Sequence, residues 1–235
     1  PGVQQPRRAR KRILRPKKLS TGAAERPGDE LPAETAQTPS WVEAAPDSVL
    51  FVEFFAGEAL LSNAASKAGV AVAPPQDAAT GGFDLSTRKG RDLAARCIEQ
   101  LAGACRQLVV HFAPPCSSFS RARDRSRRTR LRHAKAPQGI QGLSDKNLAL
   151  VRMGNKIAKN TLHLVCAAAR RRAVVSVENP AHSYLWAYLE AHGGWPQHTD
   201  VVCHQCRFGT PWRKATRFRL LNCKFPELDL QCKTH

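Results

Sequence analysis

The chain has 235 residues, 42% of them hydrophobic, and its 37 basic against 19 acidic side chains give a formal net charge of +18. This length and hydrophobic content exclude a fibrous or wholly disordered protein and predict one main domain. No run of about 18 apolar residues could span a membrane, and the basic start has no apolar segment behind it, so we expect an intracellular protein. A charge of this size indicates a polyanionic partner.

The positive charge is concentrated in two runs. Residues 7–18 hold eight basic side chains and no acid, and residues 121–135 hold eight basic side chains and one acid. The first run lies in a proline-containing stretch with almost no apolar periodicity, so residues 1–46 are predicted to be a disordered basic arm. Such an arm could direct the protein to a nucleus in a eukaryotic cell, grip phosphates, or be no more than a solvated tail.

From about Ser48 the sequence alternates between short apolar runs and longer segments with helical periodicity, the order expected of a doubly wound α/β sheet. We therefore predict a Rossmann-like domain over 47–222 and a C-terminal tail over 223–235. In the first predicted helix five apolar residues share one face: Leu60, Leu61, Ala64, Ala65 and Ala68. The predicted strands are 49–54, 70–73, 107–112, 173–177, 200–203 and 216–221, and the predicted helices are 57–68, 91–106, 145–172 and 184–192.

Ligands of an open α/β sheet bind outside the carboxyl ends of its strands. The first strand ends in the turn Glu53-Phe54-Phe55-Ala56-Gly57, where the glycine allows a ligand to approach the backbone at a helix start. Asp77 follows about 20 residues later, the distance at which an acid bonds a nucleoside ribose in dinucleotide-binding folds, and Asp84 is a further acid. Each aspartate could also be an ordinary turn residue.

The third predicted strand stops at a proline pair followed by Cys116. The prolines stiffen the backbone, and the sequence becomes strongly cationic from Arg121 onward. A thiol on a rigid loop near arginines has its thiolate favoured, which is what a cysteine nucleophile needs. A buried structural cysteine is the alternative, but the prolines interrupt the strand and move Cys116 toward the rim of the sheet.

The fourth predicted strand is followed by Glu178-Asn179-Pro180. A carboxylate that leaves a hydrophobic strand is costly unless it is paired or used. Because the two strands are expected to be neighbours, Cys116 and Glu178 would lie at the same edge of the sheet.

These segments together resemble the 5-cytosine DNA methyltransferases. The 53–57 turn is similar to the family's Asp-Leu-Phe-Ala-Gly cofactor motif, and residues 114–120 are similar to its Pro-Pro-Cys-Gln-x-Phe-Ser nucleophile loop. Glu178-Asn179-Pro180 resembles the Glu-Asn-Val motif, and Gln205-Cys206-Arg207 resembles the start of the Gln-x-Arg-x-Arg strand. Residues 116–130 also resemble methyltransferase-like proteins of dinoflagellates.

The resemblance covers residues 49–221 and has departures. Ser117 stands where the family has glutamine, and Gln205-Cys206-Arg207-Phe208 lacks the second arginine. After Leu221 the sequence offers no room for the family's target-recognition domain, so we expect that domain to be missing. The chain would then be a fragment, a minimal variant that recognises DNA through its basic loop, or an inactive protein.

The resemblance implies a cofactor and a mechanism. S-adenosylmethionine would lie against the 55–57 turn and Pro115, with its ribose on Asp77 and its adenine near Asp84. Cys116 would attack carbon 6 of cytosine, Glu178 would bond the ring nitrogen, and Arg207 would hold the pyrimidine or orient the glutamate. The target base would have to be flipped out of a duplex. The residues expected to clamp the DNA strand are Ser120, Arg121, Arg123, Arg125, Arg127, Arg128 and Arg130.

Three alternatives remain open at this point. Cys203, Cys206, Cys223, Cys232 and His235 could supply zinc ligands, although their spacing is irregular for a known zinc module and we expect no metal. A second alternative is a nucleic-acid-binding protein that keeps the methyltransferase fold without catalysis. The third is an enzyme that methylates cytosine in RNA.

Overall fold

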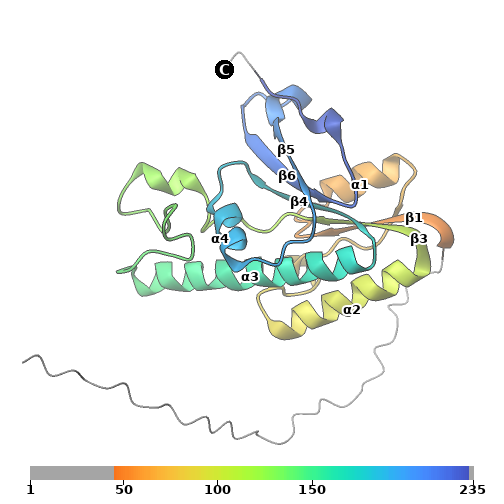
Figure 1. Ribbon diagram of the computed structural model, residues 1–235, viewed down its shortest axis with the longest axis horizontal. Helices are drawn as coiled ribbons and strands as arrows, with labels where there is room; N and C mark the ends of the chain where they lie inside the picture. Colours follow the sequence, from red (N-terminus) through yellow and green to blue (C-terminus); the bar gives the residue numbers. More distant parts are fainter. Residues whose placement is uncertain (1–44, 233–235) are drawn as a thin grey trace, which may run out of the picture. The chain divides into compact units, whose positions relative to one another are not determined.

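The computed structural model describes residues 45–232, which form an α/β unit built on one six-stranded sheet (Figure 1). The strands are β1 (Ala45–Phe54), β2 (Ala71–Val72), β3 (Cys105–Phe112), β4 (Val174–Pro180), β5 (Thr199–His204) and β6 (Ala215–Leu221). The α-helices are α1 (Leu60–Lys67), α2 (Arg88–Ala104), α3 (Asp145–Arg170) and α4 (Tyr184–His192). Short 3₁₀ turns lie at Ala78–Thr80, Arg121–Arg125, Gln205–Phe208 and Pro226–Leu228.

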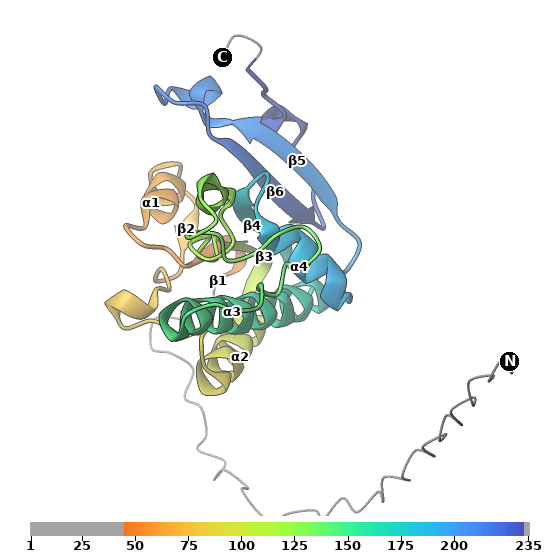
Figure 2. The same ribbon diagram turned by 90° about the vertical axis from the view of Figure 1, so that its left-hand side faces the viewer.

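The sheet is mixed, with the strand order β2-β1-β3-β4-β6-β5. The first four strands in this order are parallel, whereas β6 runs antiparallel to both β4 and β5. Helix α1 covers one face of the sheet, and α2 and α3 lie side by side on the other (Figures 1 and 2). No helix in the described part of the chain is both long and apolar enough to cross a membrane.

The core lies between the sheet and the α2–α3 layer. Because successive side chains of a strand point to opposite faces, every second residue of β1, β3 and β4 enters this core. The buried strand residues are Val52, Phe54, Leu108, Val110, Phe112, Val175 and Val177, and they pack against Ala94, Ile98, Leu101, Leu164, Val165 and Ala168 of the two helices. The rings of Phe54 and Phe112 stack with centroids 5.0 Å apart, which fixes the carboxyl ends of β1 and β3 next to each other.

All the predicted helices and strands of the domain are present, and α4 has the predicted bounds. Strand β4 ends three residues later than predicted, so Glu178-Asn179-Pro180 belongs to the strand and does not follow it. The strand start that the family resemblance implies at Gln205-Cys206-Arg207 is wrong, because these residues form a 3₁₀ turn after β5. The predicted arm 1–46 lies outside the described residues except for its last two, which begin β1.

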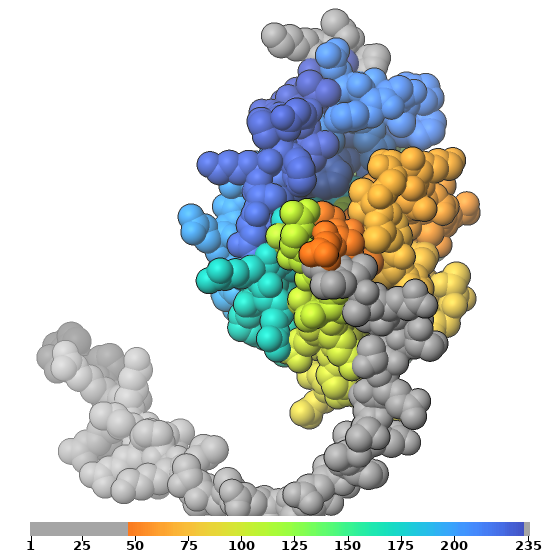
Figure 3. Space-filling view, turned by 90° about the vertical axis from the view of Figure 1, so that its right-hand side faces the viewer, coloured from red at the N-terminus to blue at the C-terminus, as the bar shows by residue number. Residues whose placement is uncertain are grey.

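Helix α1 differs from its prediction in start and in orientation. It begins at Leu60 because Ala59 adopts a left-handed conformation with φ 53°. Its buried residue is Ser62, whereas Leu60, on the apolar face, is 73% exposed. The backbone N–H and the hydroxyl of Ser62 both donate to Oε2 of the buried Glu53, at 2.8 and 2.6 Å. This polar contact turns the apolar face outward, and α1 lies at the surface (Figure 3).

Candidate active site

The carboxyl ends of the parallel strands carry the segments that the sequence analysis selected, and Figure 2 faces this edge. The turn after β1 is held by two hydrogen bonds from the N–H groups of Phe55 and Ala56 to the Gln76 carbonyl, at 2.8 and 3.2 Å. Phe55 and Gly57 both have positive φ angles, 63° and 51°. The Gly57 N–H donates to Oδ2 of Asp77 at 3.0 Å, so the structure joins two residues that were predicted to bind the same ligand.

Glu53 is already engaged within the fold. Its Oε2 atom accepts both donors of Ser62, and the side chain is buried. An acid near the start of a helix is favoured by the unpaired N–H groups there. Glu53 therefore fixes α1 to the end of β1.

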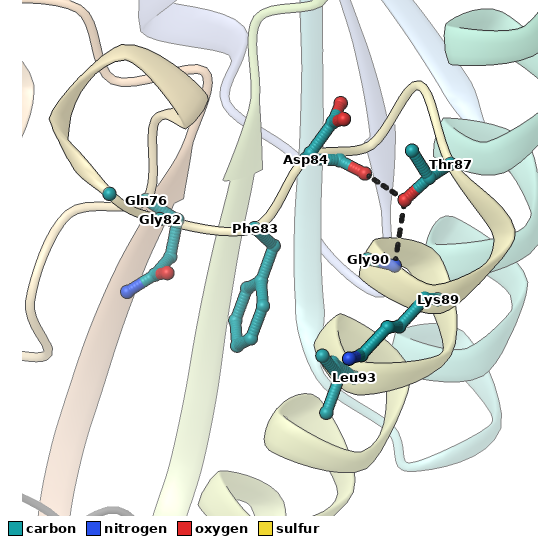
Figure 4. Close-up of a pocket in the computed structure, with 9 residues that line it drawn as sticks. Gln76, Gly82, Phe83, Asp84, Thr87, Lys89, Gly90 and Leu93 are labelled. Atoms are coloured by element: carbon teal, nitrogen blue, oxygen red, sulfur yellow. Dashed lines mark hydrogen bonds between the residues drawn. The ribbon is translucent and has the colours of Figure 1, made fainter.

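A cavity of about 390 Å³ lies beside this turn, between residues 76–84 and the start of α2 (Figure 4). Asp84 is the predicted cofactor residue that lines it, and hydrogen bonds from Ser86 lower the pKa of Asp84. A Cβ at Gly90 would lie 2.0 Å from the Asp84 carbonyl oxygen, so the close approach of the two backbones requires glycine. The lining residues are Gln76, Gly81, Gly82, Phe83, Asp84, Thr87, Lys89, Gly90 and Leu93.

Cys116 is half-buried and lines a second cavity, of about 580 Å³, while Pro115 is exposed. Nε of Arg123 donates to the Ser117 carbonyl at 2.7 Å and so ties the basic turn to the cysteine loop. The lining residues are Cys116, Ser117, Ser120, Ala122, Arg123, Arg125, Ser126 and Thr129. The cavity thus combines a thiol with hydroxyl groups and two guanidinium groups.

Arg132, in the same basic run, is no surface cation. Its side chain is 1% exposed and donates to the carbonyl groups of Ser118 and Pro137 and to Oδ1 of Asn155. The guanidinium lies 3.7 Å from the centroid of the Phe119 ring. Burial lowers the pKa of Arg132 to about 10, so it stays charged at neutral pH. Arg132 fastens the cysteine loop to α3, a role that no pattern in the sequence predicts.

The single acid of the second basic run organises the loop around itself. Asp124 lies 3.6 Å from Nε of Arg121 and 3.5 Å from Nε of Arg130, and it accepts a hydrogen bond from the Tyr184 hydroxyl at 2.7 Å. Two of the predicted phosphate contacts therefore have an acidic partner. Three of the predicted contacts are exposed and form no ion pair with a described residue: Arg125, Arg127 and Arg128.

Glu178 projects from β4 at the position paired with Phe218 of β6. Its Oε1 atom lies 3.6 Å from Nζ of Lys214, and burial raises the pKa of Glu178 although the lysine opposes this shift. Glu178 is not among the residues that line the cavity of Cys116. The neighbouring Asn179 does reach the cysteine loop, since its Nδ2 donates to the Pro114 carbonyl at 2.7 Å.

Arg207 is exposed on the 3₁₀ turn after β5, and the structure does not bring it into the Cys116 cavity. Among residues 45–232, no three His, Cys, Asp or Glu side chains gather as a metal site. His235, one of the zinc ligands considered, lies outside the described residues. Cys232 instead donates its backbone N–H to Nδ1 of His204 at 2.8 Å, which packs the C-terminal segment against β5.

Comparison of the chain with protein-family models, with curated proteins and with solved structures found no match. Over residues 45–232 the fold is α/β, with a six-stranded mixed sheet and four α-helices.

Proposed function

We propose that this protein is an S-adenosylmethionine-dependent methyltransferase that modifies carbon 5 of cytosine in DNA, with Cys116 as its nucleophile. The observation that carries the proposal is the hydrogen bond from Nδ2 of Asn179 to the Pro114 carbonyl, at 2.7 Å. It connects the segment that resembles the Glu-Asn-Val motif to the segment that resembles the nucleophile loop. Residues 65 positions apart in the sequence thus meet at one edge of the sheet.

The strand order supports a doubly wound, Rossmann-like classification. Chain order reverses between β1 and β3, since β2 lies on one side of this pair and β4 on the other. In doubly wound sheets the ligand crevice lies outside the strand ends at this reversal. The Gly57 turn and the Cys116 loop follow the two strands concerned. The antiparallel β6 is a departure from an all-parallel sheet.

The cavity beside β1 fits a nucleoside cofactor. Its volume of about 390 Å³ lies within the range of about 300–1,000 Å³ typical of ligand pockets. Phe83 offers an aromatic surface for an adenine. The Asp84 carboxylate points away from that ring (Figure 4), and Asp77 accepts hydrogen bonds from the N–H groups of Gly57 and Ala79, so a ribose would have to share Asp77 with them. S-adenosylmethionine bound here would supply the methyl group.

The chemistry of the chain's own residues follows from their surroundings. The sulfur of Cys116 would form a bond to carbon 6 of cytosine, and the ring electrons displaced would make carbon 5 nucleophilic. Burial raises the pKa of Glu178 and so makes its carboxyl group easier to protonate; once protonated, it could donate to the ring nitrogen and neutralise the developing charge. Once carbon 5 has taken the methyl group, a solvent base would remove the proton on carbon 5, and its electron pair would re-form the double bond to carbon 6. The bond from carbon 6 to sulfur would then break, Cys116 would leave as a thiolate, and the ring nitrogen would return its proton to Glu178. Glu178 would have to exchange its contact with Lys214 for the base.

DNA is the proposed polymer because exposed arginines follow the nucleophile loop directly. Arg125, Arg127 and Arg128 can contact phosphates, whose neutralisation releases counterions. Carbon 6 is inaccessible in a stacked duplex, so the base must be extruded. RNA remains an alternative polymer for the same chemistry.

The experiment is covalent trapping with 5-fluorocytosine DNA and S-adenosylmethionine. Fluorine at carbon 5 cannot leave as the proton does, so the sulfur–carbon bond persists and the protein migrates more slowly on a denaturing gel. We expect the adduct with the parent and with Cys223→Ser, a control at another half-buried cysteine, and none with Cys116→Ser. A parallel arm uses 5-fluorocytosine RNA. Cofactor binding by calorimetry without any adduct on either polymer would refute the proposal.

A second candidate is nucleic-acid binding without catalysis. It is favoured by the Glu178–Lys214 pair and by the absence of Glu178 from the lining of the Cys116 cavity. This candidate predicts salt-dependent nucleic-acid binding that is unchanged in Cys116→Ser and in Glu178→Gln, with no adduct and no cofactor binding.

A further inference from the structure

The turn between β5 and β6, residues 205–214, exposes two aromatic rings among cations. Phe208 is 52% and Trp212 60% exposed, and the one other exposed large aromatic side chain in residues 45–232 is Phe225, at 43%. The turn holds no acid, and its basic residues are Arg207, Arg213 and Lys214. Exposed aromatic surface on a soluble domain marks a contact surface when it is clustered.

The turn has a defined conformation. The N–H of Gln205 donates to the Lys214 carbonyl at 3.0 Å and closes its base. Near its tip, Gly209 has φ 93°, and the Thr210 hydroxyl donates to the Trp212 carbonyl at 3.0 Å. The two rings are therefore presented by a folded turn.

The turn also stands at the edge that carries the proposed site. Strand β5 is parallel to β4, so the segment after β5 leaves the sheet on the same side as the Cys116 loop. Figure 2 shows this turn above the green segment that follows β3. At its base Lys214 contacts Glu178 at 3.6 Å. A polymer bound by Arg125, Arg127 and Arg128 therefore meets a second basic surface on the same edge.

Aromatic rings surrounded by cations suit nucleic acid better than protein. Cations without acids attract a polyanion, and exposed rings stack on bases with a contribution of about 1–3 kcal/mol per base. Within a duplex each base is already stacked on its neighbours, so the rings can be used only by bases that are unpaired.

We propose that the 205–214 turn is a stacking platform for unpaired bases, and that the nucleic acid bound by this protein is single-stranded or opened beside the platform. The inference rests on the proposed function in taking nucleic acid as the polymer at this edge, and it adds the strand state of that polymer. Phe208 and Trp212 are the stacking residues, and the cations of the turn hold the backbone.

The test compares single-stranded and duplex oligonucleotides of about 12 nucleotides, labelled with fluorescein, by fluorescence anisotropy with the full chain. We expect Trp212→Ala and Phe208→Ala each to weaken single-strand binding about 5-fold or more and to change duplex binding less than about 2-fold. Phe225→Ala is the matched control and should bind both like the parent. Urea denaturation of each variant verifies that it is folded.

A spectroscopic measurement separates stacking from a change in charge. Single strands should quench the tryptophan fluorescence of the parent, and the quenching should diminish in Trp212→Phe, which can still stack. Equal single-strand affinity in the parent, Trp212→Ala and Phe208→Ala would overturn the inference. So would a loss of affinity in these variants that is equal for single-stranded and duplex oligonucleotides. An adduct in the trapping experiment together with either of these results would leave the methyltransferase proposal standing. Weakened single-strand binding without any adduct would support the platform alone.

Discussion

Replacing Arg132 by methionine removes a buried charge while keeping most of the side-chain volume. The carbonyl groups of Ser118 and Pro137, both in buried residues, would each lose the Arg132 donor. A buried acceptor without a partner costs about 1–3 kcal/mol, so the two together should lower the free energy of unfolding by about 2–6 kcal/mol. Relief of the desolvated charge offsets part of this loss and places the expected value in the lower half of that range.

The measurement is urea denaturation followed by circular dichroism. Arg128→Met, in the same basic run but exposed, is the matched control and should change the free energy of unfolding by less than about 0.5 kcal/mol. Because Arg132 also fastens the cysteine loop to α3, Arg132→Met should increase the rate at which iodoacetamide alkylates Cys116 in the folded protein. If Arg132→Met were as stable as Arg128→Met, the guanidinium would not hold the loop and the reasoning would be wrong.

Three further predictions concern other parts of the fold. Burial lowers the pKa of His111 to about 4 from its ordinary value of about 6.5. The neutral imidazole therefore makes its full contribution to the free energy of unfolding above pH 6.5, and this contribution is lost as the pH falls from 6.5 through 4. From pH 7 to pH 4, the free energy of unfolding measured by urea denaturation should therefore fall by about 3 kcal/mol more in the parent than in His111→Gln. Gly154→Ala should lower the free energy of unfolding by about 1–3 kcal/mol, because its Cβ would lie 2.3 Å from Oγ of Ser118, whereas Gly103→Ala, whose Cβ meets nothing within 4 Å, should raise it by up to about 1 kcal/mol. Replacing the exposed arginines of the basic loop together by glutamine should reduce the slope of log K for nucleic-acid binding against log salt concentration by about 2.7. Between 50 and 200 mM salt, the affinity of the parent should therefore fall about 40-fold more than the affinity of the variant. These arginines are Arg125, Arg127 and Arg128.

Each of these outcomes has a result that contradicts it. A pH dependence of stability in His111→Gln equal to that of the parent would mean that His111 accepts a proton in the folded state. Equal effects of the two glycine substitutions would mean that α3 does not pack as closely on the cysteine loop as it does in the structure. For the salt dependence, the control is the triple change of Arg170, Arg171 and Arg172 to glutamine at the far end of α3. An equal change of slope in both triple variants would show that the loop has no special part in binding.

The basic run 121–135 illustrates how charge is accommodated in a folded loop. Eight cations would repel one another if all were extended in solvent. Asp124 brings Arg121 and Arg130 together, and Arg132 exchanges water for carbonyl oxygens and an aromatic ring. What remains for a polyanion is a smaller, oriented set of guanidinium groups. The expected salt dependence is accordingly weaker than a count of the basic residues implies.

The order of strands and helices could be predicted from the sequence because periodicity is a local property. Apolar runs in β1, β3 and β4 and the helical spacing in α2 and α3 identify elements that need a buried face. The sequence also predicts that the turn at Gly57 and the loop at Cys116 lie at strand ends, because glycine in the first case and a proline pair in the second end the preceding strand. The hydrogen bond between Gly57 and Asp77 was not predicted, because the spacing of the two residues indicated a ribose contact and not a contact with each other.

The tertiary structure alone decided which of these residues are free to act. Periodicity says that a helix has an apolar face but not what covers it, and in α1 the Glu53–Ser62 contact turned that face to solvent. The sequence does not show which residue a charged side chain contacts in the fold. The burial of Arg132 and the pairing of Glu178 with Lys214 were therefore not predicted. Both depend on contacts between segments distant in sequence, whose free energies arise from desolvation and geometry that exist only once the chain has folded.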